Sequence, residues 1–175
     1  MRIEPATLKD CDLVAEVHVA AWRAAYEGLL PPEFLTALSV ERRAAAWRQI
    51  LQERQSELLL ARSDADLMGF VSFGRSRDED ALPERGEIWS IYLHPQHWSS
   101  GVGRALWMAA NERLSQLGFS STSLWVIIGN ERAMRFYAKA GFEVESGSDK
   151  NLQIGDSLLR EIRLVRTSDR QAMLR

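Results

Sequence analysis

The residue types best suited to chemistry lie in two clusters in the second half of the chain. The first cluster, at an expected loop-to-helix junction, consists of Ser99, Ser100, Gly101, Val102, Gly103 and Arg104. Glycines at such a junction let the backbone approach a ligand, and the first-turn N–H groups and the helix dipole favour negative charge. The cluster fits a pyrophosphate, although a lone Gly-x-Gly also fits a simple turn entering an ordinary helix.

Two well-known nucleotide-binding motifs are excluded by the residues of this first cluster. A dinucleotide-binding fingerprint requires a third small residue where Leu106 stands, on a tight turn directly after a strand. A Walker A loop requires Gly-Lys-Ser or Gly-Lys-Thr, and the chain has neither at this junction. A Rossmann or P-loop nucleotide site is therefore not expected here.

The second cluster has the pattern of an amphipathic helix with a cap at each end. Asn130 is the expected N-cap, and Gly141 is the expected terminator. Between them Ala133, Phe136 and Tyr137 recur at helical spacing. Taken alone, this pattern predicts a helix packed against a core.

The elements that position both clusters follow from hydrophobic periodicity and capping signals. Thr7 to Asp10 reads as a capping box for a first helix that ends near Ala25, with Leu13 and Val17 on its aliphatic face. Ser39 is a plausible cap for a second helix, and two more helices begin at Val102 and after Asn130. The expected strands lie near Arg2–Glu4, Glu57–Arg62, Leu67–Arg75, Glu87–Leu93, Ser123–Ile128, Phe142–Ser146 and Leu158–Val165. This order predicts an α/β (α+β type) protein with a mixed central sheet of about seven strands and about four helices.

Bulk composition favours a single domain over residues 1–166, followed by a loose tail at 167–175. The chain has 175 residues, an apolar fraction of 46%, a charged fraction of 26% and a net charge of −2, with both signs interleaved. No nucleic-acid partner is therefore expected. Cys11 is the lone cysteine, which excludes an intramolecular disulfide, and no apolar run approaches a membrane span. We expect a cytoplasmic protein with no membrane partner.

Together the two clusters resemble the signature motifs of the Gcn5-related N-acetyltransferase (GNAT) superfamily. The first motif of that family is Gln/Arg-x-x-Gly-x-Gly/Ala, and the second is Asn-x-x-Ala-x-x-Phe-Tyr-x-x-x-Gly-Phe. The segment from Glu87 to Pro95 also looks like the family's fourth strand and the turn that leaves it. The resemblance covers essentially the whole chain. It implies a GNAT fold and transfer of an acetyl group from acetyl-CoA to a primary amine, by direct attack in a ternary complex and without a metal.

The resemblance also implies which positions hold acetyl-CoA. They are Ile91, Tyr92, Leu93, Ser99, Ser100, Gly101, Val102, Gly103, Arg104, Asn130, Ala133 and Tyr137. In this scheme the strand residues pair with pantetheine, and the Leu93 N–H stabilises the oxyanion. One position departs from the family pattern, because Trp98 stands where the family has Gln or Arg. Since main-chain amides hold most of the pyrophosphate, we expect cofactor binding to survive this change.

The family resemblance also implies catalytic roles for two residues, which are assigned by their positions in the motifs. Tyr137 matches the family's general acid, and a phenol with a reference pKa near ~10 suits reprotonation of a thiolate. The alternative is core packing, since Tyr137 shares a helix face with Ala133. Glu87 lies fourteen residues before Gly101, the separation at which some family members place a general base. The alternative is a strand-end glutamate facing solvent, in which case His18 or a water chain is the next candidate base.

Histidine and aromatic residues suggest where the acceptor binds. His18, Trp22 and Tyr26 recur at i, i+4 and i+8 on the first helix. They either pack against the second helix or form a wall of the acceptor pocket, which this helix pair flanks in the family. His94 and His97 lie in a loop without cysteine or carboxylate companions, so no metal site is expected there.

The acceptor itself is expected to be a small-molecule or peptide amine. The segment Trp22–Tyr26 resembles uncharacterised bacterial-type members of the family, which favours a small metabolite, antibiotic or amino-acid analogue over a ribosomal N-terminus. A protein N-terminal amine acetyltransferase remains an alternative. So does a weakly catalytic module that binds or senses acetyl-CoA, and a homodimer is possible.

Overall fold

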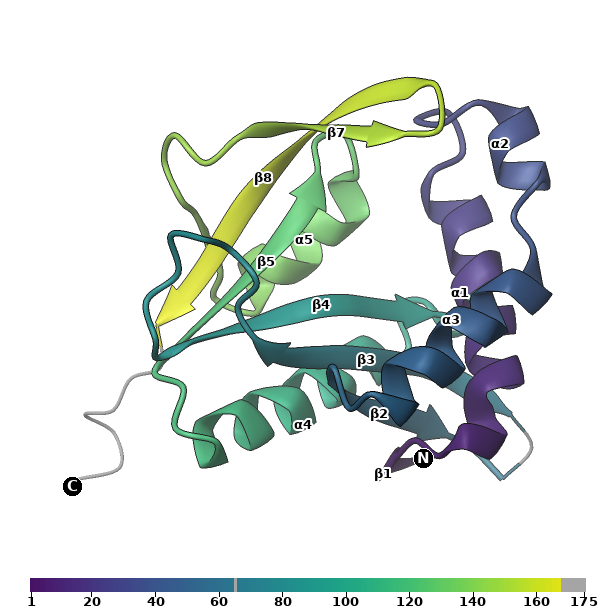
Figure 1. Cartoon of the computed structure of the whole chain (residues 1–175), viewed down its shortest axis with the longest axis horizontal. Helices are drawn as coiled ribbons and strands as arrows, with labels where there is room; N and C mark the ends of the chain where they lie inside the picture. Colours follow the sequence, from purple (N-terminus) through teal and green to yellow (C-terminus); the bar gives the residue numbers. More distant parts are fainter. Residues whose placement is uncertain (65, 168–175) are drawn as a thin grey trace. The chain divides into compact units, whose positions relative to one another are not determined.

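The computed structural model describes residues 1–64 and 66–167 of the chain (Figure 1). Its helical elements are η1 (Leu8–Asp10), α1 (Cys11–Ala25), α2 (Pro32–Thr36), α3 (Val40–Gln52), η2 (Pro95–His97), α4 (Val102–Gln116) and α5 (Glu131–Lys139). Its strands are β1 (Arg2–Pro5), β2 (Glu57–Arg62), β3 (Leu67–Arg75), β4 (Arg85–Leu93), β5 (Ser121–Ile127), β6 (Glu143–Val144), β7 (Lys150–Ile154) and β8 (Ser157–Thr167). Of the tail expected at 167–175, Thr167 ends β8, and residues 168–175 lie outside the described part.

The strands form a mixed sheet, which confirms the expected α/β class. Hydrogen-bonded neighbours follow the order β1-β2-β3-β4-β5-β8-β6, and β7 pairs with β8. The β4–β5 pair is parallel, whereas β5, β6 and β7 each run antiparallel to β8. The short helices α2 and η2 and the strand β7 were not expected from the sequence, and with β7 the sheet has eight strands rather than about seven.

Contacts between Cα atoms divide the chain into two compact units, each made of two segments. Among the described residues, the first unit contains 1–64, 66–73 and 90–110, and the second contains 74–89 and 111–167. The strands β3 and β4 and the helix α4 each contribute residues to both units. The single domain expected over residues 1–166 remains a prediction.

The core of the first unit lies where α1 and α3 pack beside one another (Figure 1). Ser39 caps α3 as expected, because its hydroxyl accepts the Arg42 N–H at 3.1 Å. The buried face of α1 differs from the expected one, since Leu13 is 41% exposed. The buried cluster consists of Cys11, Val14, Ala15, Val17, Ala44, Trp47, Leu58, Leu60, Leu67 and Phe70. These side chains come from α1, α3 and two strands, and they fix which sides of α1 and α3 face each other.

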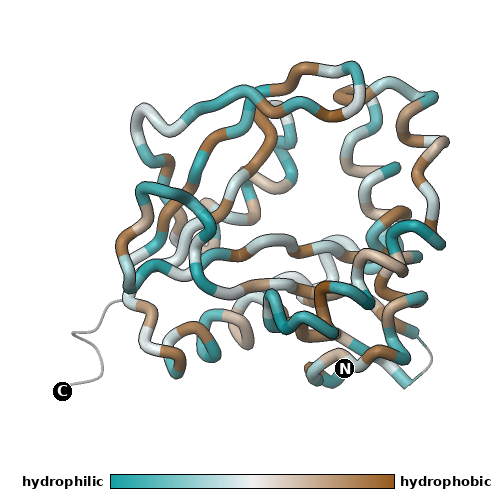
Figure 2. The backbone as a smooth tube through the Cα atoms, viewed as in Figure 1, coloured by the Kyte–Doolittle hydropathy of each residue, from teal (hydrophilic) through white to brown (hydrophobic). Residues whose placement is uncertain are grey.

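The second unit is organised around β5 and β8. Strand β5 is paired on both sides, with the first part of β4 and with β8, and its Leu124, Val126 and Ile127 are buried. This matches the burial expected for its continuous apolar run. The β7–β8 hairpin closes through a two-residue turn at Gly155, whose φ is 55°. Figure 2 shows polar and apolar residues alternating along this hairpin, and no residue of β7 is buried.

Candidate active site

The loop between β4 and α4 is fastened to the end of the strand by Trp98. Its indole N–H donates to the Leu93 carbonyl at 3.2 Å. The Ser100 hydroxyl donates to the His97 carbonyl at 2.6 Å, which tightens the same loop. Gly101 has a φ of 86°, a left-handed conformation that favours glycine, and Ser99 has a φ of 61°. Trp98 therefore holds the loop in place, a role that the sequence comparison did not suggest.

This loop leads directly into the first turn of α4. The Ala105 N–H makes the first helical hydrogen bond, to the Gly101 carbonyl at 3.1 Å. The N–H groups of Val102, Gly103 and Arg104 precede it and belong to the set that a helix leaves without intrahelical acceptors. Arg104 is exposed and can add positive charge. The junction thus has the donors that bind phosphate at a helix N-terminus.

The end of β4 holds Ile91, Tyr92 and Leu93, all half-buried. Its path depends on the close approach of Gly69 in β3. A Cβ atom on Gly69 would lie 2.8 Å from the Tyr92 carbonyl oxygen and 3.2 Å from the Leu93 Cα. The His94 N–H then bonds the Met68 carbonyl at 2.9 Å. The absence of a side chain at Gly69 therefore allows this close approach of the strand end.

Tyr137 lies on α5, in the second unit, within a group of aromatic rings. Its ring centroid is 5.2 Å from that of Phe136 and 5.7 Å from that of Phe142. Asn130 caps the helix as expected, accepting the Ala133 N–H on its side-chain oxygen at 3.1 Å. Ala133 and Tyr137 are half-buried, and no residue of α5 is fully buried. The packing expected for Tyr137 is present, and this packing also leaves a role in proton transfer open.

Glu87 is buried in the second unit, so the alternative of a solvent-facing strand end is wrong. Its side chain is 2% exposed. One carboxylate oxygen accepts the Arg77 backbone N–H at 2.8 Å, and the other accepts the Arg77 Nε at 3.2 Å and forms an ion pair with Nη2. The Arg77 guanidinium also lies 4.3 Å from the Trp89 ring centroid. Since a carboxylate offers about four acceptor positions, Arg77 leaves roughly one for any further hydrogen bond.

His18 is buried on α1 among aromatic rings of the first unit. The nearest is Tyr92, with a centroid distance of 4.7 Å. The Trp47 indole N–H, which can only donate, bonds the His18 Nδ1 at 3.2 Å. Burial, together with the charge of Arg43, lowers the pKa of His18 to about 3. The imidazole is therefore neutral near pH 7, its proton is on Nε2, and it has no free lone pair with which to act as a base.

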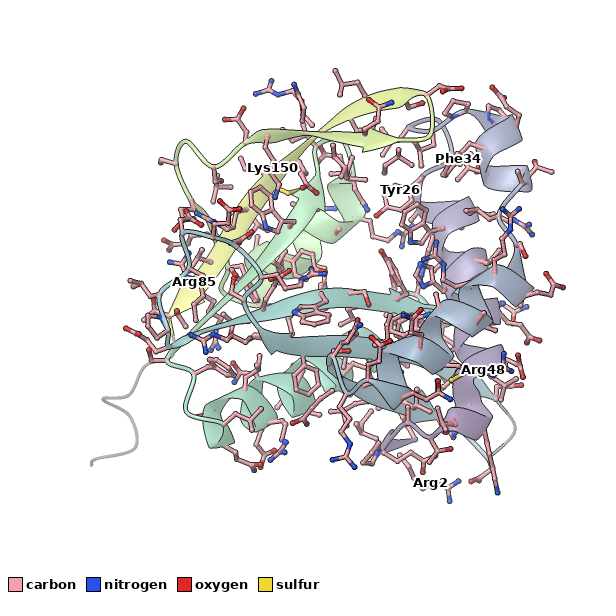
Figure 3. All side chains as sticks on the ribbon, viewed as in Figure 1. Arg2, Tyr26, Phe34, Arg48, Arg85 and Lys150 are labelled. Carbon is pink, nitrogen blue, oxygen red and sulfur yellow. The ribbon has the colours of Figure 1, made fainter. Side chains whose placement is uncertain are left out.

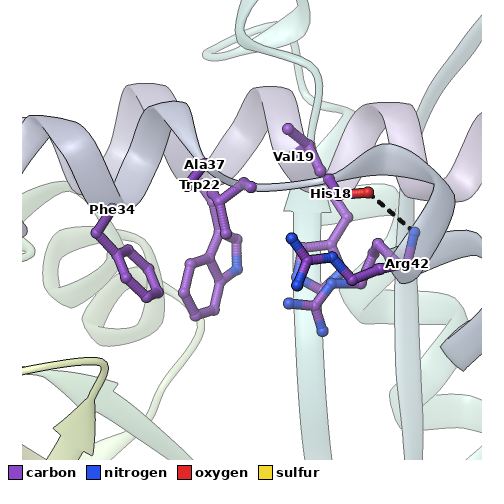
Figure 4. Close-up of a pocket in the computed structure, with 9 residues that line it drawn as sticks. His18, Val19, Trp22, Phe34, Ala37 and Arg42 are labelled. Carbon is purple, nitrogen blue, oxygen red and sulfur yellow. Dashed lines mark hydrogen bonds between the residues drawn. The ribbon is translucent and has the colours of Figure 1, made fainter.

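A cavity of about 430 Å³ opens beside His18 in the first unit (Figure 4). Its lining comes from α1, from α2 with the turn that follows it, and from the start of α3. The residues are His18, Val19, Trp22, Phe34, Ala37, Leu38, Ser39, Arg42 and Arg43. Of the three residues expected to bind substrate, His18 and Trp22 line this cavity. Tyr26 is buried beside it, with its ring 5.0 Å from that of Trp22.

Sequence analysis missed three prominent residues of this cavity. Phe34 belongs to α2, a five-residue helix that follows two prolines and has no clear periodicity. Arg42 and Arg43 stand on the polar face of α3. A signal was present, because cations in the first turn of a helix oppose its dipole and are therefore unfavourable without another role.

The chain is similar to known proteins over most of its length. Residues 19–142 match the model of the acetyltransferase (GNAT) family. The chain belongs to this family. It is 30% identical over 162 residues to an uncharacterized N-acetyltransferase, YuaI, of Bacillus subtilis (strain 168), and the match covers 93% of this chain and 90% of YuaI. The expected family is therefore confirmed.

Two further proteins extend the comparison. The chain is 26% identical to a spermidine N(1)-acetyltransferase of Thermoplasma acidophilum, with 85% of this chain and 93% of the relative covered. The solved structure of PaiA N-acetyltransferase from the same organism, in complex with coenzyme A, superposes with a TM-score of 0.73 at 20% identity. That match covers 95% of this chain and 99% of PaiA. At this identity the solved structure supports the GNAT fold.

Within residues 1–64 and 66–167, neither a membrane helix nor a metal cluster is found. No helix in these ranges is long and apolar enough to cross a membrane. No group of three or more His, Cys, Asp and Glu side chains in them is arranged to hold a metal ion.

Proposed function

We propose that this protein transfers the acetyl group of acetyl-CoA to a primary amine of a small molecule or peptide. The observation that carries the proposal is the junction of β4 and α4, where first-turn N–H groups follow a left-handed Gly101. Membership of the GNAT family and the coenzyme A complex of PaiA support the choice of cofactor. In this proposal Ser99 to Arg104 bind the pyrophosphate, and Ile91 to Leu93 pair with the pantetheine chain.

Catalysis in this proposal proceeds by direct attack in a ternary complex. The neutral amine nitrogen attacks the acetyl carbonyl carbon, and the Leu93 N–H stabilises the oxyanion that forms. The carbon–sulfur bond then breaks, and the thiolate receives a proton from the Tyr137 hydroxyl. The amine nitrogen loses one proton in the same reaction. The half-buried face of α5 supports a cofactor role for Tyr137, because a fully packed face would leave no room for a ligand.

The proposed mechanism also requires a group that accepts the amine proton. Glu87 can serve only through the acceptor position that Arg77 leaves, or through a water bound there. His18 is a poor candidate, because its Nδ1 is occupied by Trp47 and its pKa is about 3. We retain Glu87 as the proposed base, with a water chain as the alternative.

The donor site is tested by Gly103→Val, read out by calorimetry with acetyl-CoA. A β-branched side chain in the first turn of α4 would crowd the phosphates, so we expect affinity to fall at least tenfold. Ala109→Val, later in the same helix, is the matched control and should leave affinity unchanged. Unchanged affinity in a folded Gly103→Val protein would remove the junction from the proposal.

Turnover is tested by release of the free thiol of coenzyme A with a library of amines. Release that depends on an amine supports an N-acetyltransferase. A second candidate function, a module that binds acetyl-CoA without turnover, is favoured by Trp98 in place of Gln or Arg and by the ion pair of Glu87. Tight acetyl-CoA binding without thiol release from any amine would favour that module instead.

A further inference from the structure

The unsatisfied polar groups around the cavity in the first unit are all hydrogen-bond donors. The proton on His18 Nε2 has no partner among the described residues, although the side chain is only 6% exposed. Trp22 Nε1 likewise has no partner in hydrogen-bond geometry within the described chain. Burial raises the pKa of the neighbouring Tyr92 phenol, and the nearby Trp22 indole lowers it. The indole N–H is close to Tyr92 but outside hydrogen-bond geometry, so Nε1 still has no partner in the described chain. A buried donor without an acceptor is unfavourable, so an acceptor is needed here.

The acceptors near the cavity are, by contrast, already engaged. The Ser39 hydroxyl accepts the Arg42 N–H and donates to Glu41 at 2.8 Å. Arg23 on α1 donates to three carbonyls at the end of α2 and just after it, those of Leu35, Thr36 and Leu38, at 3.0 to 3.2 Å. Every residue that lines the cavity is described, and none is an aspartate or glutamate. The cavity therefore offers a ligand donors and positive charge.

Two guanidinium groups provide that charge. Arg42 and Arg43 lie in the first turn of α3, where the helix dipole disfavours a cation. The Arg43 guanidinium lies 5.9 Å from the Trp22 ring centroid. Within residues 1–64 and 66–167, no ion pair or side-chain hydrogen bond engages either guanidinium. Figure 4 shows the Trp22 indole between Phe34 and Arg42, so the cavity has an aromatic part and a cationic part.

We propose that this cavity binds a carboxylate on the acceptor, so that the acetylated amine belongs to an amino-acid-like molecule. Arg42 and Arg43 bind the carboxylate, and Trp22 and Phe34 contact the apolar part of the acceptor. The proposal rests on the proposed N-acetyltransferase function and names its substrate class. It also predicts a difference from a polyamine enzyme, because two unpaired guanidinium groups would repel a polycation such as spermidine.

The position of the cavity connects this substrate class to the proposed donor strand. His18, which lines the cavity, packs on Tyr92 at a centroid distance of 4.7 Å. Tyr92 precedes Leu93, the proposed oxyanion donor, and both lie in the first unit with the cavity. A carboxylate held by the arginines would therefore orient the acceptor beside the end of β4.

The first test compares amino acids with their primary amides as acceptors. The amide keeps the amine and the side chain and removes the negative charge. We expect kcat/KM for thiol release to be at least tenfold higher for the acid. The amine of an amide is less basic and more often neutral, which favours the amide, so a preference for the acid cannot arise from amine ionisation.

The second test removes the arginine charges. Arg42→Gln and Arg43→Gln should each reduce the preference for the acid at least threefold, and the double variant at least tenfold, through KM rather than kcat. Arg48→Gln is the matched control on the same helix (Figure 3), because Arg48 pairs with Asp12 at 2.6 Å and does not line the cavity. It should retain the wild-type preference.

A binding measurement separates this proposal from the proposed function. Calorimetry compares N-acetyl amino acids, the expected products, with the corresponding N-acetyl amides, in wild type and in the double variant. If amines are acetylated without preference for the acid, the carboxylate proposal is overturned and the N-acetyltransferase remains. If no amine is acetylated but the acids bind and the double variant weakens them at least tenfold, the site is supported and the activity is overturned. If no amine is acetylated and the N-acetyl amino acids do not bind, both the carboxylate site and the N-acetyltransferase function are overturned.

Discussion

Two buried titratable groups, one in each unit, differ in how their surroundings satisfy them. Glu87 is 2% exposed, and its charge is compensated by three hydrogen bonds from Arg77. His18 is 6% exposed and neutral, and its remaining N–H has no partner in the described chain. Removing the partner of a buried charge is strongly destabilising. A buried donor without a partner, beside cations that have no ion pair in the described chain, can instead bond to a ligand. Both groups are buried, and they differ in whether their polar atoms have partners in the described chain.

The largest expected effect comes from leaving Glu87 without its counter-ion. Arg77→Met removes the guanidinium that pairs with Glu87 and lies over the Trp89 ring, so the buried carboxylate keeps only the hydrogen bond from the backbone N–H of residue 77. We expect the free energy of unfolding to fall by about 3 kcal/mol, near the lower end for a broken buried pair because Arg77 is itself half-exposed. Arg43→Met in the cavity should change it by less than about 0.5 kcal/mol. Denaturant unfolding measures both, and equal losses would contradict the comparison.

Tyr137 in the second unit tests whether a packed side chain also takes part in the chemistry. Tyr137→Phe retains the ring contacts with Phe136 and Phe142 and removes the proton donor. On the proposed mechanism kcat falls by ~10²-fold, with little change in KM for acetyl-CoA. The measurement is steady-state kinetics under conditions where the chemical step limits turnover. A kcat within twofold of wild type would make the hydroxyl structural.

A Glu87 variant tests whether this carboxylate can accept a proton despite its ion pair with Arg77. Glu87→Gln is nearly isosteric, so the contact with Arg77 can persist while the base is lost. If Glu87 is the base, kcat/KM falls about tenfold across neutral pH and the acidic limb of the pH–rate profile disappears. Kinetics between about pH 6 and pH 9 decide this. A rise in KM with an intact acidic limb would show that Glu87 only attracts the acceptor.

The smallest effect at neutral pH is expected for His18. Its folded-state pKa of about 3 lies below the ordinary value of about 6.5, so only the unfolded state takes up the proton between these values. The free energy of unfolding therefore falls as pH falls through this window, because the unfolded state binds up to one more proton than the folded state. His18→Gln, whose amide oxygen can still accept the Trp47 N–H, should be close to wild type at pH 7 and less acid-sensitive. Thermal unfolding from pH 7 to pH 4 measures this difference.

His97→Gln provides the matched control for that series. His97 is a half-exposed residue of the loop before α4, outside the cavity. Its replacement should leave the acid sensitivity of the wild type unchanged. Equal behaviour of the two variants would show that His18 is not protected from protonation in the folded state.

Local features of the structure were accessible from the sequence because they depend on neighbouring residues. The caps at Ser39 and Asn130 form within three residues of the groups they satisfy. The bounds of β2 and β3 agree with the expected ones, since their apolar runs end at polar or turn residues. The family motifs are contiguous segments, so they too can be recognised without knowledge of the fold. Residues 99–104 accordingly lie at a loop-to-helix junction, as expected.

Features that join distant segments were decided only by the tertiary structure. The side of α1 that is buried depends on α3, so Leu13 is exposed while His18 is enclosed. Strand β7 has no buried residue and pairs along its length with β8, and it left little apolar signal in the sequence.

The chemical states of His18 and Glu87 were likewise invisible along the chain. The tautomer of His18 is set by Trp47, twenty-nine residues away. The environment of Glu87 is set by Arg77, on the preceding connection between strands. The cavity combines residues of α1, α2 and α3. Sequence periodicity did not single out Phe34 on α2 or the two arginines on α3. A sequence specifies which groups are available, but hydrogen-bond satisfaction depends on distances that exist only once the chain is folded.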